Sequence, residues 1–312
     1  MDLIKAMYIA KWYGLEYMPK LASARNDNRL TYAGVPILSA DDSNILIAKA
    51  INEQSPFMAG RFGSCELNIM WRANENKQKW DVTPVKAMKY LHENAGFFPN
   101  DTDAALKFAY EMKNASRSVD LLGVWFNKME DYELKKWSEN YQICRLRSLE
   151  PFFSEKPWTA ALEGKKVLVI HPFDESIKKQ YSNRRALFDH PVLPDFELIA
   201  KRAVQTIAGN TDTRFSTWFD ALDYMYEEAM KETFDVAIIG CGAYGFPLAS
   251  RLKQEGKVAI HLGGVTQVLF GIRGARWDAR PEYQDLMTDA WVRPSDTEVP
   301  PNAQSIENGC YW

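Results

Sequence analysis

The sequence has little cysteine, and what it has is scattered. The chain of 312 residues contains four cysteines, Cys65, Cys144, Cys241 and Cys310, and none of them form a C-x-x-C pair. A structural zinc site of the common kind is therefore not expected. Lone cysteines fit a reducing compartment better than a disulfide framework, so the sequence predicts a cytoplasmic protein.

Long apolar runs and blocks of a single charge are also missing. No stretch of 18 apolar residues occurs, so no transmembrane segment is expected. Charged residues interrupt the apolar positions at the start of the chain, so no secretory signal peptide is expected either. The net charge is −3 and there is no basic block, which argues against nucleic acid as the main partner.

The first segment is rich in Met, Tyr, Trp and Leu, with Lys5, Lys11 and Lys20 between them, and it predicts a helix to about Tyr17. One interpretation is a helix that packs on its own domain or on a second copy in a homo-oligomer. The other is a helix that contacts a membrane surface or a partner, which would place the protein peripherally at the inner membrane face.

The overall composition is that of an ordinary globular protein, with 46% hydrophobic and 25% charged residues. Short apolar runs alternate with amphipathic stretches along most of the chain. Strands are predicted at 57–62, 119–126, 143–146, 166–171, 236–239 and 258–262. Helices are predicted at 44–52, 66–74, 102–114, 127–139, 175–188, 216–231 and from the glycine-rich turn to about 255. The segment 196–207 fits either a strand or a helix.

This alternation is typical of a parallel sheet covered on both faces. The predicted fold is α/β, a doubly wound, mostly parallel sheet with Rossmann-like βαβ units and a helical N-terminal segment. The expected organisation is a helical segment at 1–55 packed on the core and two α/β halves at 56–150 and 151–312. The second half carries a glycine-rich nucleotide-binding turn.

That turn follows the apolar run at 236–239 and contains Gly240, Gly242, Tyr244 and Gly245, a literal G-x-G-x-x-G. Glycine tolerates positive φ and lets a ligand approach the backbone, and the first turn of the following helix favours an anion. A dinucleotide site would also need an acidic residue at the end of the second strand, where the sequence has His261-Leu-Gly-Gly. A phosphate-bearing ligand other than NAD is therefore favoured, with close packing as the alternative.

Other predicted strand ends carry polar residues as well. Arg61 is suited to bind a phosphate, and Glu66 to act as a general base or to hold sugar hydroxyls; alternatively the two pair with each other at the start of a helix. His171 and His261 either donate to a phosphate or substrate hydroxyl or are satisfied by nearby backbone.

Beyond the Gly263-Gly264 turn come Gln267, Arg273, Arg276 and Trp277. Arginines next to an aromatic are suited to clamp a diphosphate and stack a base or sugar. The alternative is that they tie the C-terminal segment to the domain, with Asp278 pairing with Arg276.

The turn Arg61-Phe-Gly-Ser-Cys-Glu66 resembles the R-F-G-D-G-E turn of the bacterial GT-D type glycosyltransferases, which supplies a D-x-E motif. The late strand, glycine turn, helix and strand are also similar in layout. The resemblance implies transfer of a sugar from a nucleotide-diphosphate donor to a glycan or lipid-linked acceptor, in the synthesis of a surface polysaccharide or glycoconjugate. Glu66 matches the glutamate of the motif, and Arg61 and Gly63 match its R-x-G.

Ser64 stands where the family has aspartate. Since a neutral hydroxyl binds Mg²⁺ or Mn²⁺ poorly, metal dependence is left open and no metal ligand is predicted. The predicted catalytic residues are Glu66, Arg61 and His171. The predicted donor-binding residues are Gly63, Ser64, Gly240, Gly242, Tyr244, Gly245, His261, Gly263, Gly264, Gln267, Arg276 and Trp277. Two alternatives are a non-catalytic nucleotide- or sugar-binding subunit and an NAD(P)-dependent oxidoreductase.

Overall fold

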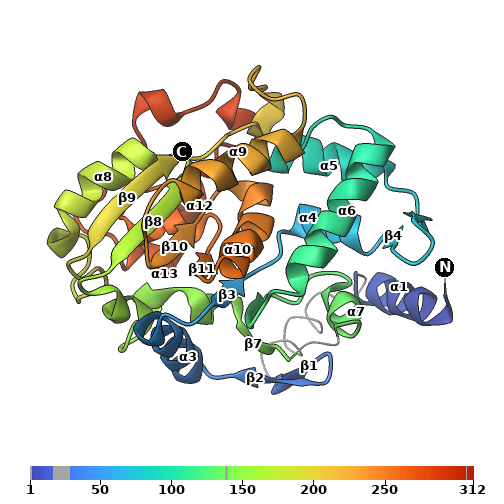
Figure 1. The fold of residues 1–312 in the computed structure, drawn as a ribbon, viewed down its shortest axis with the longest axis horizontal. Helices are drawn as coiled ribbons and strands as arrows, with labels where there is room; N and C mark the ends of the chain where they lie inside the picture. Colours follow the sequence, from blue (N-terminus) through green and yellow to red (C-terminus); the bar gives the residue numbers. More distant parts are fainter. Residues whose placement is uncertain (1, 17–28, 138–139, 307) are drawn as a thin grey trace.

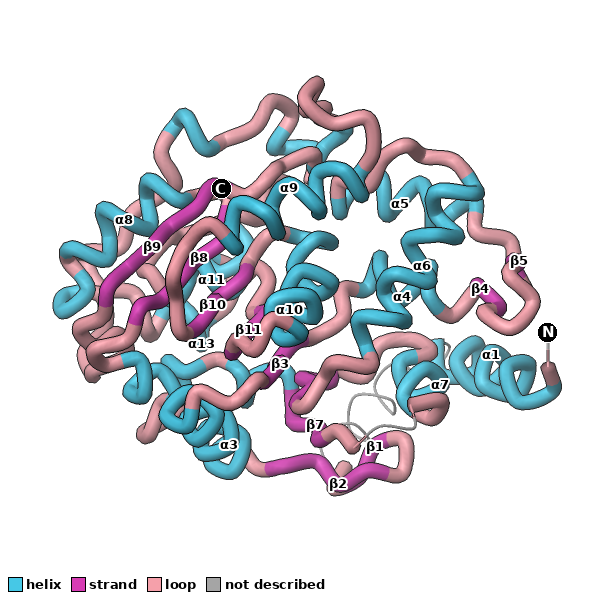
Figure 2. The backbone as a smooth tube through the Cα atoms, viewed as in Figure 1, coloured by secondary structure: helices cyan, strands magenta, loops and turns pink. Residues whose placement is uncertain are grey.

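A computed structural model describes residues 2–16, 29–137, 140–306 and 308–312 (Figure 1). Nine strands form one sheet in the order β1-β2-β7-β6-β3-β11-β10-β8-β9, and all neighbours are parallel except β1 and β2. Figure 2 shows these strands side by side from β9 to β1. Their bounds are β1 Thr31–Tyr32, β2 Val35–Leu38, β3 Phe57–Gly60, β6 Leu121–Val124, β7 Gln142–Arg145, β8 Lys166–His171, β9 Glu197–Arg202, β10 Val236–Ile239 and β11 Val258–His261. The two short strands β4 (Ala73–Asn74) and β5 (Lys79–Trp80) pair separately.

Helices cover both faces of the large sheet. Successive side chains of a strand point to opposite faces, and in the central strands both sets are apolar and need cover. In β3, for example, Met58 packs into one apolar cluster while Phe57 and Ala59 pack into the other. The first cluster involves α4 (Ser64–Met70), α5 (Val85–Ala95), α6 (Thr102–Ser116), α9 (Trp218–Met230) and α10 (Gly245–Gln254). The second involves α3 (Ala40–Glu53), α8 (Asp174–Ser182), α11 (Val265–Leu269), α12 (Ala275–Asp278) and α13 (Pro281–Gln284).

The chain changes direction between β8 and β10, which are neighbours in the sheet. From β8 it passes through α8 to β9 on one side, and from β10 it passes through α10 to β11 on the other. The loops that leave these two strands therefore separate, and a crevice opens outside their carboxyl ends. This is where open α/β sheets bind their ligands.

The predicted fold class is confirmed, and most differences concern boundaries. The strand expected at 57–62 ends at Gly60, and the one expected at 119–126 ends at Val124. The ambiguous segment 196–207 contains β9, which is paired along its length with β8. Helix α5 and the short strands β4 and β5 had no prediction, and β1 and β2 lie in the segment 1–55 that was expected to be helical. The helix expected at 127–139 is α7, Glu130–Leu134. The domain boundaries stay a prediction, since one sheet runs through both halves.

The N-terminal helix α1 (Leu3–Glu16) is held by polar contacts. Lys5 donates to Asp81 at 3.0 Å, and the indole N–H of Trp12 donates to Asp131 at 3.0 Å. Leu3, Ile4 and Met7 on this helix are exposed. Contact with a membrane or a second copy stays a prediction, and residues 17–28 of the predicted segment lie outside the described residues. Among the helices that the structure describes, none has the length and apolarity needed to cross a bilayer.

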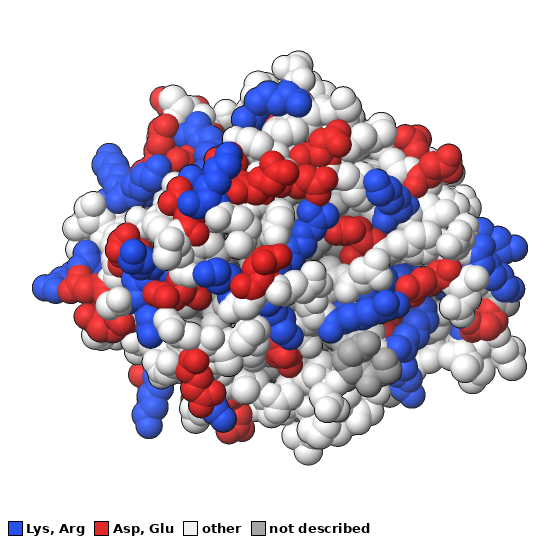
Figure 3. All heavy atoms as spheres, in the orientation of Figure 1, with Lys and Arg blue, Asp and Glu red and all other residues white. Residues whose placement is uncertain are grey.

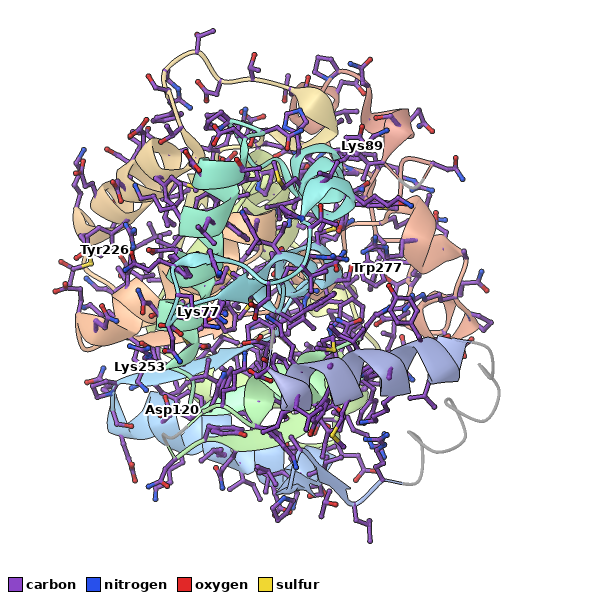
Figure 4. All side chains as sticks on the ribbon, turned by 90° about the vertical axis from the view of Figure 1, so that its right-hand side faces the viewer. Lys77, Lys89, Asp120, Tyr226, Lys253 and Trp277 are labelled. Carbon is purple, nitrogen blue, oxygen red and sulfur yellow. The ribbon has the colours of Figure 1, made fainter. Side chains whose placement is uncertain are left out.

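An ion pair lies at the amino ends of the strands. Lys253, at the end of α10, lies 2.7 Å from Asp120, which directly precedes β6. Figure 4 shows these two residues together on one side of the molecule and Trp277, which follows the last strands, on the other. On the face seen in Figure 3, positive and negative side chains are interspersed, without the basic stripe of a nucleic-acid-binding surface.

Candidate functional site

A cavity of about 560 Å³ lies outside the carboxyl ends of the central strands. The loops after β3, β6, β8, β10 and β11 all contribute to its wall. All but one of the predicted site residues line it: Arg61, Gly63, Ser64, Glu66, His171, Gly240, Gly242, Tyr244, His261, Gly263, Gly264, Gln267, Arg276 and Trp277. The exception is Gly245. The roles predicted for these residues are not tested by their placement.

Glu66 lies in the first turn of α4, and its carboxylate folds back over Gly63. A Cβ at position 63 would lie only 1.8 Å from Oε2 of Glu66, so this position must be glycine if the carboxylate is to stay where it is. Glu66 is 8% exposed. Burial raises the pKa of Glu66, while its own backbone amide and the charge of Arg61 oppose the shift. A carboxyl with a raised pKa is suited to accept a proton near neutral pH.

The guanidinium of Arg61 lies against Gly263, in the turn that follows β11, much as the carboxylate of Glu66 lies against Gly63. A Cβ on Gly263 would lie 2.2 Å from Nη2 of Arg61, and Gly263 also has φ of +66°. The guanidinium donates weakly to the carbonyl of Phe62 at 3.4 Å, and no carboxylate among the described residues pairs with it. The predicted alternative, a direct ion pair between Arg61 and Glu66, is therefore not what the structure has. Arg61 is a cation in the wall of the cavity, available to an anionic ligand.

His171 ends β8 with its orientation fixed by the backbone. Its Nδ1 accepts the N–H of Phe173 at 3.0 Å, and the ring is 4% exposed. Burial lowers the pKa of His171 to about 3, partly opposed by the charge of Asp174. The imidazole is therefore neutral at physiological pH, with its proton on Nε2 as a hydrogen-bond donor. One nitrogen is therefore satisfied by backbone, and donation from the other nitrogen to a ligand stays a prediction.

His261 ends β11 and lies against Gly245, which explains the glycine that does not line the cavity. A Cβ at Gly245 would come within 2.5 Å of Cδ2 of the His261 ring. Burial lowers the pKa of His261 to about 3, and the charge of Arg61 adds to the shift. Neither ring nitrogen forms a hydrogen bond of good geometry within the described residues. The backbone of Arg61 lies near this ring, and a role of His261 in binding the donor stays a prediction.

The glycine-rich turn after β10 forms another wall. Gly242 has φ of +60°, a conformation that glycine adopts at little cost. Tyr244 stacks on Trp218 with ring centroids 4.9 Å apart, and its hydroxyl lies 3.1 Å from the hydroxyl of Thr206. The turn is therefore held from the side by an aromatic pair, while Gly240 and Gly242 border the cavity.

The residues beyond the Gly263-Gly264 turn contact the C-terminal segment, and their role in clamping a diphosphate stays a prediction. Arg276 lines the cavity and donates to the hydroxyl of Tyr311 at 3.2 Å, with Trp277 beside it. The amide nitrogen of Gln267 donates to three backbone carbonyls, including that of Tyr311 at 3.1 Å, and so ties the C-terminal segment down, while its buried Oε1 lacks a partner among the described residues. Arg273 pairs with Asp278 at 3.1 Å and does not line the cavity. Asp278 is also paired with Arg293.

Sequence reasoning missed a second carboxyl group in this cavity. Glu150 follows β7 through a short turn, is 4% exposed, and accepts a hydrogen bond of 2.8 Å from Tyr283. Burial raises the pKa of Glu150 to about 7. Glu150 and Tyr283 are 133 positions apart in the chain, so no local sequence pattern could have linked them. Tyr311 and Arg280 also line the cavity without having been predicted.

The loop after β6 has an unusual conformation. Phe126 and Met129 have φ of +62° and +67°, values that side chains other than glycine rarely adopt. The carboxyl of Glu130 is buried beneath the loop and accepts the N–H of Asn127 at 3.2 Å. Burial raises the pKa of Glu130 to about 8, and the neighbouring backbone amides oppose the shift.

Replacing Glu130 with glutamine should make the stability of the protein less dependent on pH. A raised folded-state pKa means that the unfolded chain loses its proton first, so stability falls as pH rises from about 4.5 to about 8. We expect Glu130→Gln to gain stability relative to the wild type across that interval and the gain to level off above it. Urea unfolding at pH 5, 7 and 9 measures this, with Glu53→Gln at the exposed end of α3 as the control. A difference that does not change with pH would contradict the burial of this carboxyl.

The donor set does not fit a divalent metal. The described residues contain no group of three or more His, Cys, Asp or Glu side chains placed to hold an ion. At the turn of the predicted motif, Ser64 supplies a neutral hydroxyl, and Arg61 brings a positive charge close to Glu66. No step of the chemistry below therefore depends on a metal.

No protein-family model and no curated protein matches the chain. Among solved structures, similarity is found to a domain of unknown function 1792, with 12% identity and a TM-score of 0.43 over 75% of this chain and 79% of the other. A structure of this domain described as a distinct glycosyltransferase fold has 13% identity and a TM-score of 0.43, over 74% and 79%. One described as a new glycosyltransferase from Streptococcus sanguinis has 11% identity and a TM-score of 0.37, over 74% and 82%. Likeness at this level does not establish an activity, so function is argued from the cavity.

Proposed function

We propose that this protein is a glycosyltransferase that moves a sugar from a nucleotide-diphosphate donor to a glycan acceptor. The observation that carries the proposal is the pair of contacts at the β3 and β11 turns. Gly63 makes room for a buried carboxylate, and Gly263 makes room for a guanidinium with no carboxylate partner in the described residues. A proton acceptor and a free cation thus border the same cavity at the carboxyl edge of the sheet.

Glu66, Arg61 and Arg276 each have a role in this reaction. As the acceptor hydroxyl bonds to the anomeric carbon of the donor sugar, its proton passes to the carboxylate of Glu66. The bond from that carbon to the phosphate oxygen breaks, and the electron pair stays on the departing diphosphate. Arg61 and Arg276 stabilise the charge that develops there, which is where fixed positive groups lower a barrier.

The neutral groups supply binding and orientation. At Gly242 the turn borders the cavity and has open space beside the backbone, where a phosphate or ribose would lie. Gly240 instead makes room for Thr266 and His171, which a Cβ there would approach within 2.7 Å. The Nε2–H of His171 is a donor for a phosphate oxygen or a sugar hydroxyl, because its Nδ1 is already occupied by the N–H of Phe173. Trp277 offers an aromatic face for the base or sugar of the donor.

A thermal-shift screen tests donor binding. Purified protein is heated with UDP-, GDP-, CMP- and dTDP-sugars and with NAD(H) and NADP(H), each with and without Mn²⁺. We expect saturable stabilisation by one class of diphosphate sugar. The shift should not depend on manganese, because Arg61 rather than a metal faces the diphosphate.

Other results of the screen would favour the alternatives. A shift with NAD(H) alone would contradict the proposal and favour an oxidoreductase. A shift that requires Mn²⁺ would contradict the metal-free assignment of Arg61. Binding of a sugar nucleotide without turnover on any saccharide would indicate a non-catalytic binding subunit.

A further inference from the structure

One large aromatic side chain is left exposed inside the cavity wall. Trp125 directly follows β6 and is 38% exposed. Of the large hydrophobic side chains exposed in the described ranges, it is the one that lines the cavity. An indole in a cavity wall offers a flat aromatic face to a bound molecule.

The indole is held in a fixed orientation. Its Nε1–H donates to the backbone carbonyl of Phe62 at 3.0 Å, and the guanidinium carbon of Arg61 lies 5.6 Å from its ring centroid. The next residue, Phe126, has φ of +62°, and the buried carboxyl of Glu130 holds the loop from below through the N–H of Asn127. Strained backbone of this kind persists where the surrounding structure enforces it, and it is frequent at ligand sites.

A polar group lies two residues further on in the same wall. Asn127 lines the cavity, and its Nδ2 is buried without a hydrogen-bond partner among the described residues. An amide N–H₂ in this state is a donor that needs an acceptor oxygen from a ligand. The indole face and the amide donor therefore belong to one surface.

We propose that Trp125 and Asn127 form a subsite for a pyranose ring of the acceptor saccharide. The face of an aromatic ring is electron-rich and attracts the C–H groups on the apolar face of a sugar, while a sugar hydroxyl oxygen accepts from Asn127. The assignment of this saccharide as the acceptor rests on the proposed function. The binding of a saccharide at this subsite can be tested without any transfer.

The order of the strands favours the acceptor over the donor nucleotide. β6 lies three strands from β10 in the sheet, with β3 and β11 between them. Neighbouring strands are about 4.8 Å apart, so β6 and β10 lie roughly 14 Å apart in the sheet, and the glycine turn proposed to hold the donor phosphate follows β10. Glu66, after β3, lies between the two, where a base must be to serve an acceptor hydroxyl.

Fluorine NMR of protein labelled with 5-fluorotryptophan tests this directly. The chain has ten tryptophans, and loss of one signal in Trp125→Phe assigns the resonance of Trp125. The protein is titrated with the methyl glycosides of glucose, galactose and N-acetylglucosamine and, separately, with UDP and GDP. We expect at least one glycoside to shift the Trp125 signal saturably, and to do so also in the presence of saturating UDP or GDP, whose diphosphate would bind Arg61 beside the indole.

Variants connect the signal to binding. Trp125→Ala and Asn127→Ala should each weaken binding of that glycoside, about tenfold for the tryptophan, as stacking on an aromatic is typically worth. Tyr90→Ala, which removes an exposed aromatic outside the cavity lining, should bind it as the wild type does. A shift of the Trp125 signal with nucleotides only, or with none of the probes, would overturn the proposal. A shift with a glycoside in a protein that binds no sugar nucleotide would instead overturn the glycosyltransferase and leave the saccharide subsite.

Discussion

Replacing Glu66 with glutamine is expected to lower sugar transfer by about 10²- to 10⁴-fold, the usual contribution of a positioned general base. Glutamine has nearly the same shape and keeps the contact with Gly63, but it cannot take the proton of the acceptor hydroxyl. The fold should be unaffected. The rate is measured as nucleoside diphosphate released per minute and per enzyme molecule, at saturating donor and acceptor.

The same variant has a signature in stability that does not depend on activity. Because burial raises the pKa of Glu66 in the folded state, the unfolded chain loses this proton first, and the folded state loses stability as the pH rises above about 4.5. Glu66→Gln should therefore melt at a higher temperature than the wild type at pH 8, and the difference should disappear below about pH 4.5, where both states are protonated. Glu133→Gln, at a buried glutamate outside the cavity lining, is the activity control. Full transfer activity in Glu66→Gln would remove Glu66 from the role of base.

Replacing Gly263 with alanine is the second change with a large expected effect. The new methyl group would lie 2.2 Å from Nη2 of Arg61, so the flexible guanidinium must move away from the place where the diphosphate is proposed to bind. Loss of one stabilising group at a developing charge typically reduces kcat by about a hundredfold or more. We expect a loss of this order in transfer, together with weaker binding of UDP or GDP in a calorimetric titration.

The chain offers a matched control for this change. Gly164 has φ of +70°, close to the +66° of Gly263, but no atom lies within 4 Å of a Cβ built there. Both alanine variants should therefore lose a similar stability, about 1–2 kcal/mol for a left-handed residue. Only Gly263→Ala should lose transfer. Equal activity losses in the two variants would show that backbone strain, and not the displacement of Arg61, is responsible.

The sequence predicted the sheet and most of the cavity wall because both depend on local patterns. The apolar runs at β8, β10 and β11 are buried on both faces and could be recognised without knowledge of their neighbours. Polar residues directly after such runs gather at one edge of a parallel sheet, which is why Arg61, His171 and His261 line one cavity. The glycines could be recognised as functional candidates, but not which side chain each one makes room for.

What the sequence could not predict depends on contacts between distant segments. Glu150 lies in the cavity wall, where Tyr283, 133 positions further along the chain, donates to it. Trp125 was predicted to lie within a strand, whereas β6 ends at Val124. Gly245 was predicted to bind the donor from its place in a G-x-G-x-x-G pattern. In the structure the ring of His261 packs on it, a contact that gives close packing as the reason for glycine at this position.

The most direct test of the glycosyltransferase assignment is to follow both products of one reaction. The protein is incubated with the diphosphate sugar that stabilises it and with the saccharide that binds at Trp125, and mass spectrometry and nucleotide analysis are run on the same samples. The account predicts a saccharide longer by one sugar residue and one nucleoside diphosphate for each, both dependent on Glu66. A donor that binds saturably but is recovered intact with every saccharide tried would contradict it.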